Sequence, residues 1–102
     1  MVSVIEVTDA DELNDLIQTS DSLLLDVSAL AWCVPCQRLA PKFEAKAETS
    51  QTTFVMVDLD SNDWVTEKLG VQSVPTLIRY ERGTEVERVS GVAAVRLINE
   101  AE

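Results

Sequence analysis

The chain has 102 residues, 46% of them hydrophobic, and a formal net charge of −10. This length and composition predict one compact globular domain over residues 1–102 and argue against a disordered chain. The negative charge argues against nucleic acid or an anionic membrane surface as the main partner, and no apolar run is long enough to span a bilayer.

The amino terminus reads Met-Val-Ser-Val-Ile-Glu and lacks the basic and apolar regions of a secretion signal. We therefore expect a cytoplasmic protein in a reducing compartment, where a cysteine pair is more often catalytic than structural. We also expect a monomer.

The first third of the chain predicts a strand, a helix and a second strand. Residues 2–7 alternate weakly and indicate a short edge strand, and Thr8 or Asp9 then caps a helix. After a polar loop, the apolar run Leu23–Val27 is typical of a buried central strand in a parallel sheet. The apolar stripe of the helix consists of Leu13, Leu16 and Ile17.

Asp26 interrupts the apolar run Leu23–Val27. An acid in a buried strand is costly unless it is neutral or paired. Two interpretations stay open: Asp26 lies at the strand end and reaches water, or it is a buried acid with a raised pKa that exchanges protons with a neighbouring site.

Both cysteines of the chain follow this strand, as Cys33 and Cys36. An apolar stripe then predicts a helix to about Ser50, interrupted by Pro41, so the pair has the strand–Cys-x-x-Cys–helix layout of a redox site. A helix N-terminus stabilises a thiolate through its free N–H groups and its dipole. We expect Cys33 to be the attacking sulfur and Cys36, one turn further and more buried, to resolve the mixed disulfide.

Two other uses of the cysteines compete with this interpretation. A structural disulfide between them would close a very short loop and add little stability. Half of a zinc site would need further cysteine or histidine ligands, and the chain has two cysteines and no histidine.

After the cysteine helix, the sequence predicts another strand and another helix, followed by a hairpin and a last helix. Phe54–Val57 predicts a second parallel strand, and Gly70 ends the short helix that follows. Asp58 and Asp60 at the carboxyl end of this strand would suit acid–base catalysis or a metal, but we expect them to lie in solvent at the strand end and loop. The last elements are expected at 71–80, 85–90 and 93–101, with a turn at Gly83.

This order predicts an α/β fold, in which alternating units give a parallel sheet and the turn at Gly83 adds an antiparallel hairpin. Cys33 then follows the carboxyl end of the Leu23–Val27 strand, which is where sites open in such sheets.

These residues resemble the thioredoxin family over nearly the whole chain. Trp32-Cys33-Val34-Pro35-Cys36 is similar to the family's Trp-Cys-Gly-Pro-Cys, and Val74-Pro75-Thr76 is similar to its cis-proline loop. Pro41 has the spacing of the family's helix-kinking proline, and Gly83 and Gly91 match its two late glycines. The resemblance implies a thioredoxin-like fold with a central mixed sheet flanked by helices.

The resemblance also implies site residues. Pro75 would be cis and would bring the Val74 backbone beside Cys33, ready to pair with an extended substrate segment. Asp26 matches the family's buried acid, which assists Cys36. The implied apolar docking surface consists of Trp32, Val34, Pro35, Val74, Pro75 and Val92.

Three departures from the family's pattern concern this site. The spacing from Asp26 to Cys33 is one residue longer than is typical, and the aromatic residue after the acid is absent. Met56 stands where the family often has a lysine, so we expect Asp26 to titrate higher than usual. Val34 replaces a glycine, which adds β-branched bulk that could change the reduction potential or the choice of partner.

We therefore interpret the chain as a thiol–disulfide oxidoreductase that reduces protein disulfides through the Cys33–Cys36 couple. A thioredoxin-reductase-like electron donor would restore the dithiol, and no bound cofactor is needed. Two alternatives remain: a disulfide oxidase or isomerase, which the reduction potential would decide, and a binding module with incidental cysteines.

Overall fold

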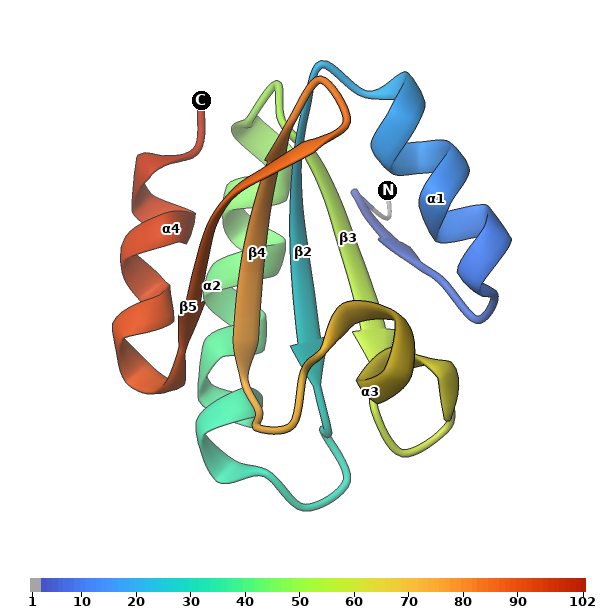
Figure 1. Ribbon diagram of the computed structural model, residues 1–102. Helices are drawn as coiled ribbons and strands as arrows, with labels where there is room; N and C mark the ends of the chain where they lie inside the picture. Colours follow the sequence, from blue (N-terminus) through green and yellow to red (C-terminus); the bar gives the residue numbers. More distant parts are fainter. Residues whose placement is uncertain (1–2) are drawn as a thin grey trace.

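Residues 3–102 are described by a computed structural model, in which helices cover both faces of a five-stranded sheet (Figure 1). The strand order is β1-β3-β2-β4-β5. Val2, where the first strand was expected to begin, lies outside the described residues. The elements are β1 (Val4–Glu6), α1 (Ala10–Thr19), β2 (Ser22–Ser28), α2 (Val34–Thr49), β3 (Thr53–Asp58), α3 (Trp64–Leu69), β4 (Thr76–Glu81), β5 (Thr84–Ser90), the 3-10 helix η1 (Gly91–Ala94) and α4 (Val95–Glu100).

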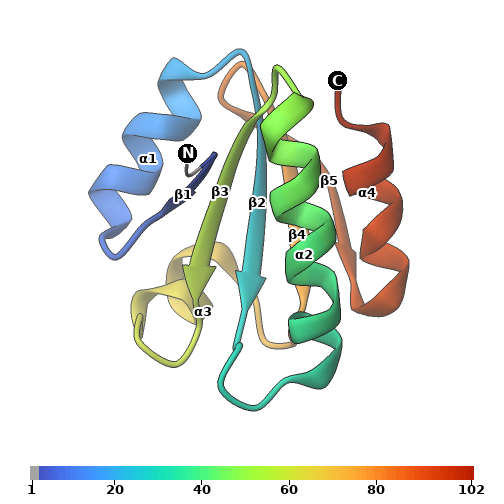
Figure 2. The ribbon, with the colours of Figure 1, turned by 180° about the vertical axis from the view of Figure 1, so that it is seen from behind.

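Strand β2 is the central strand, as its apolar run predicted. It pairs in parallel with β3 and antiparallel with β4. Its side chains alternate between two cores, since successive residues of a strand point to opposite faces. Leu25 packs in the core beneath α1 and α3, and Leu24 packs in the core beneath α2 and α4, on the other side of the sheet (Figure 2).

The direction of β4 corrects the prediction from element order. Alternating strands and helices predicted a parallel strand, but β4 runs antiparallel to β2. The reason is the short connection: the six residues of α3 span about 9 Å, whereas the six residues of β3 span about 20 Å. The chain therefore does not return along the sheet, and β4 starts at the end where β3 finishes. The result is the mixed sheet that the family resemblance implied.

The helix ends follow local sequence signals. Asp9 caps α1, and its carboxylate accepts a 3.0 Å hydrogen bond from the Asp11 N–H. Gly70 ends α3 with a φ of 67°, a left-handed conformation that favours glycine. Pro41 lies inside α2 and does not end it, because the helix continues to Thr49. No helix within residues 3–102 is both long enough and apolar enough to cross a bilayer.

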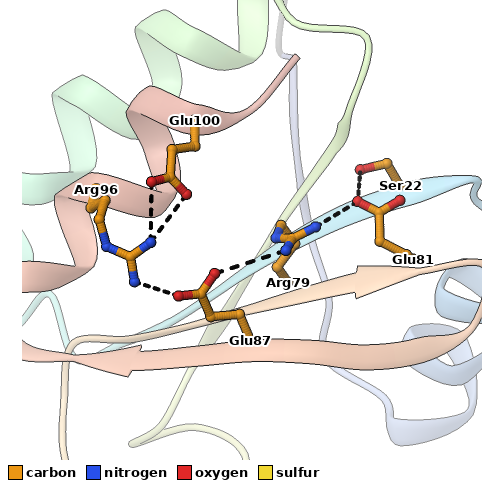
Figure 3. Close-up of polar contacts among 6 residues, drawn as sticks. All are labelled: Ser22, Arg79, Glu81, Glu87, Arg96 and Glu100. Atoms are coloured by element: carbon orange, nitrogen blue, oxygen red, sulfur yellow. Dashed lines mark hydrogen bonds and ion pairs between the residues drawn. The ribbon is translucent and has the colours of Figure 1, made fainter.

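A chain of ion pairs joins α4 to strands β4 and β5 (Figure 3). Arg79 contacts Glu81 at 2.8 Å and Glu87 at 3.8 Å. Arg96 of α4 pairs with the same Glu87 and also with Glu100 at 3.1 Å. Because all these side chains are partly exposed, solvent screens them, and burial of apolar side chains contributes more to holding α4 in place.

Candidate active site

Cys33 is the N-cap of α2, and its position after the carboxyl end of β2 confirms the prediction. Its Sγ accepts a 3.2 Å hydrogen bond from the Cys36 N–H, and the two cysteines form a disulfide with Cα atoms 5.2 Å apart. Cys33 is 4% exposed and Cys36 is fully buried, so Cys33 is the more accessible of the two residues. Among the described residues, no group of three or more acidic, cysteine or histidine side chains could hold a metal ion.

The longer loop between β2 and α2 is closed by its own hydrogen bonds. The N–H groups of Trp32 and Cys33 both donate to the Ala29 carbonyl, at 3.3 and 2.9 Å. Gln37, in the first part of α2, donates from Nε2 to the Leu30 carbonyl at 2.8 Å. The additional residue is therefore held in a tight turn, which fixes the approach of the chain to Cys33.

Asp60 contributes to the site in a way that the sequence analysis missed. It was expected in solvent, and it is exposed, but its Oδ2 accepts a 2.8 Å hydrogen bond from the Trp32 indole. The sequence could have indicated this contact, because Asp60 follows the carboxyl end of β3. That end lies beside the end of β2, where the loop to Cys33 (the redox loop) begins.

The Val74–Pro75 peptide bond is cis, as the resemblance implied. The Val74 carbonyl oxygen lies 3.8 Å from the Sγ of Cys33, which places this backbone beside the disulfide. The Pro75 carbonyl accepts a 2.8 Å hydrogen bond from the Gly91 N–H, so the segment that carries Val92 is attached to the same loop.

Most of the predicted docking residues reach the surface. Trp32, Val34 and Val92 are 60%, 51% and 80% exposed, and they are three of the five large apolar side chains that are exposed among the described residues. Pro35 is also exposed and Val74 partly so. Pro75 differs, because it is buried and so does not belong to the exposed part of the predicted docking surface.

Asp26 is buried, so the interpretation that it reaches water is wrong. It is 1% exposed. Its Oδ1 accepts a 2.5 Å hydrogen bond from the Ser28 hydroxyl, and its Oδ2 has no hydrogen-bond partner. Burial raises the pKa of Asp26 to about 6, against a smaller lowering by the Ser28 hydrogen bond. The direction agrees with the raised pKa expected for a buried acid.

Comparison with known proteins gives one consistent result. A family model described as Thioredoxin matches residues 3–101. The thioredoxin of Chlamydia caviae is 37% identical over 102 residues, which cover 95% of this chain and 98% of that protein. A bifunctional thioredoxin reductase/thioredoxin of Mycobacterium leprae is 36% identical over 89 residues, which cover 85% of this chain and 19% of that protein.

Solved structures agree. The oxidised thioredoxin of Plasmodium falciparum superposes with a TM-score of 0.83 at 34% identity, over 95% of this chain and 96% of that one. A mutant thioredoxin of Halobacterium salinarum gives 0.84 at 34% identity, over 96% and 89%. The chain therefore belongs to the thioredoxin family and is a thiol–disulfide reductase with Cys33 and Cys36 as its redox couple.

Proposed function

We propose that Cys33 is the nucleophile and Cys36 the resolving thiol in the reduction of protein disulfides. The Cys33 thiolate attacks one substrate sulfur and releases the other as a thiolate. The Cys36 thiolate then attacks Cys33, forms the Cys33–Cys36 disulfide and releases the second substrate sulfur. The observation that supports these roles best is the hydrogen bond from the Cys36 N–H to the Cys33 sulfur at the start of α2, because this environment stabilises a thiolate.

Asp26 is the group that we assign to proton exchange with Cys36. A thiol must lose its proton before it attacks, and a buried base with a pKa near the working pH suits that task. Burial, the unpartnered Oδ2 and the pKa of about 6 support this role.

The substrate is proposed to bind as an extended segment along the Val74 backbone, over the loop that Pro75 shapes. The short distance from the Val74 carbonyl to the Cys33 sulfur supports this mode, since strand addition places a substrate disulfide beside the nucleophile. The apolar side chains that would contact the segment belong to Trp32, Val34, Pro35, Val74 and Val92.

A thioredoxin-reductase-like protein is the proposed electron donor. The Mycobacterium leprae relative, whose name joins both activities, supports this partner. The net charge of −10 supports protein partners over nucleic acid or an anionic membrane. A cytoplasmic monomer that consists of one thioredoxin-like domain remains our proposal for the state in which it acts.

Reduction of insulin by dithiothreitol tests the two cysteine roles. The wild type should accelerate the reaction, and Cys33→Ser should not. Cys36→Ser should instead accumulate a mixed disulfide through Cys33, because the resolving thiol is missing. A mixed disulfide formed by Cys33→Ser through Cys36 would reverse the assignment of the two sulfurs.

A further inference from the structure

Ser28 and Asp26 lie on the face of β2 that α2 covers. Leu24 packs on that face, and side chains two residues apart along a strand share a face. Leu77, the partner of Asp26 on β4, packs in the same core with Phe43 of α2. The Asp26 carboxyl therefore points into the layer between β2 and α2.

The rise per residue of helix and strand places Cys36 between the levels of these two side chains. The rings of Phe43 and Phe54 are 4.7 Å apart, and Phe54 pairs with Leu24, so Phe43 lies level with Leu24. Helix α2 runs opposite to β2 (Figure 2). Cys36 is seven residues before Phe43, about 10 Å along the helix. Asp26 and Ser28 are about 7 and 13 Å beyond Leu24, so they lie just below and just above the level of Cys36.

Besides the Ser28 hydroxyl, the polar side chain that α2 buries near Asp26 is that of Cys36. Met56 and Leu77 flank Asp26 on the neighbouring strands, and Cys36 is the titratable side chain among those that α2 buries. The pKa of Asp26 is set first by burial and then by the Ser28 hydroxyl, without a contribution from a charged group. The other helical side chains buried on this face are apolar: Leu39, Phe43, Ala47, Ala94, Leu97 and Ile98.

We propose that Ser28 is a positioning residue for the resolving step, because its hydroxyl occupies Oδ1 of Asp26 and leaves Oδ2 as the oxygen that takes the proton of Cys36. The inference rests on the proposed role of Asp26. In this step the proton passes from the Cys36 sulfur to Oδ2, and the Cys36 thiolate attacks the Cys33 sulfur of the mixed disulfide. The bond from Cys33 to the substrate breaks, and the substrate sulfur leaves with the electron pair and takes a proton from water.

Direct titration of the Asp26 carboxyl by NMR is the first test. It is made on the oxidised protein, in which no thiol titrates. Removal of a donor to a carboxylate favours its neutral form, so Ser28→Ala should raise the pKa of Asp26 by about one pH unit. Ser28→Thr keeps the hydroxyl and should titrate as the wild type does. An unchanged pKa in Ser28→Ala would overturn the proposal.

The second test measures the reaction. Single-turnover oxidation of the reduced protein by insulin is followed by tryptophan fluorescence between about pH 5 and about pH 9. The acid limb of the rate profile should move to higher pH in Ser28→Ala, by as much as the pKa of Asp26 moves, and should return in Ser28→Thr. In an Asp26→Asn background, Ser28→Ala should change nothing further. A shifted Asp26 pKa with an unchanged rate profile would also overturn the proposal.

The controls separate this proposal from the role of Asp26. If Asp26→Asn leaves the profile unchanged while Cys33→Ser abolishes the reaction, the proton role of Asp26 fails and this inference fails with it. If Asp26→Asn moves the profile and Ser28→Ala does not, only the inference fails. Should Ser28→Ala not fold, the wild type still decides. A Ser28 hydroxyl proton that is protected from exchange and responds to Asp26 titration supports the bond, and its absence refutes it.

Discussion

Trp32 and Asp60 are 28 residues apart in the sequence, yet the indole N–H of Trp32 donates a 2.8 Å hydrogen bond to Oδ2 of Asp60. The bond connects the redox loop to the loop that follows β3. It restrains a residue that is 60% exposed and therefore has few packing contacts to hold it. The largest apolar side chain of the proposed docking surface is thus oriented before any substrate arrives.

Removal of the Asp60 carboxylate should weaken substrate reduction. Asp60→Ala frees the indole, and loss of one hydrogen bond worth about 1 kcal/mol predicts a fall of about fivefold in kcat/KM with insulin. Asp60→Asn keeps an acceptor oxygen and should stay near the wild type. The nearby exposed Asp63→Ala is the matched control. An equal loss in Asp60→Asn and Asp60→Ala would show that the charge matters and not the orientation of the ring.

The Gln37 side chain should govern the mobility of the redox loop. Gln37→Ala removes the 2.8 Å bond to the Leu30 carbonyl, so amide exchange at Trp32 and Cys33 should become faster. Hydrogen–deuterium exchange measured by NMR checks this. Substitution of the adjacent exposed residue, Arg38→Ala, should leave those amides unchanged. Unchanged exchange in Gln37→Ala would mean that the backbone bonds to Ala29 suffice.

Asp26 should make the protein less stable as the pH rises. Its pKa is about 6 in the folded protein and 3.8 as an ordinary value, so between these limits the folded state keeps a proton that the unfolded chain has lost. The free energy of unfolding therefore falls over this range by about 3 kcal/mol through Asp26 alone. Below it both states are protonated, and this contribution is fully retained.

Urea unfolding of the oxidised wild type and Asp26→Asn tests that sign. The asparagine side chain does not ionise, so the stability of the variant relative to the wild type should increase from about pH 4 to about pH 7, by about 3 kcal/mol at most. Titrations elsewhere cancel in the difference. A stability difference that stays constant with pH would show that the folded protein ionises Asp26 as easily as the unfolded chain does.

The ion pairs of Arg96 should give a small stability that depends on salt. Arg96→Gln removes its contacts with Glu87 and Glu100 and should lower the urea midpoint slightly at low ionic strength. The difference from the wild type should shrink in high salt, because salt screens exposed pairs. Lys42→Gln, on the exposed face of α2, is the control for loss of a positive charge. A loss that persists in high salt would point to packing of the Arg96 stem.

Most of the structure around the cysteine pair could be predicted from local sequence. A strand, two cysteines and a helix start place Cys33 correctly, because each depends on neighbouring residues alone. The direction of β4 could not be predicted from the order of elements, because it depends on the length of α3. This helix is too short to return the chain to the other end of the sheet. The bond between Trp32 and Asp60 required two loops to meet in space. The hydrogen bond from Ser28 to Asp26 could have been predicted from the sequence, since residues two apart in a strand share a face.

The sulfur of Cys33 accepts a hydrogen bond in the first turn of α2 and is also the atom that we propose to attack the substrate. Its strength as an acceptor therefore changes through the catalytic cycle, from thiolate to mixed disulfide to the disulfide with Cys36, because an ionised acceptor binds an N–H more strongly. We therefore expect the first turn of α2 to be most stable when Cys33 is a thiolate, and less stable once Cys33 has been oxidised to a disulfide. The Cys36 amide proton is in this way a built-in reporter of how far each turnover has gone.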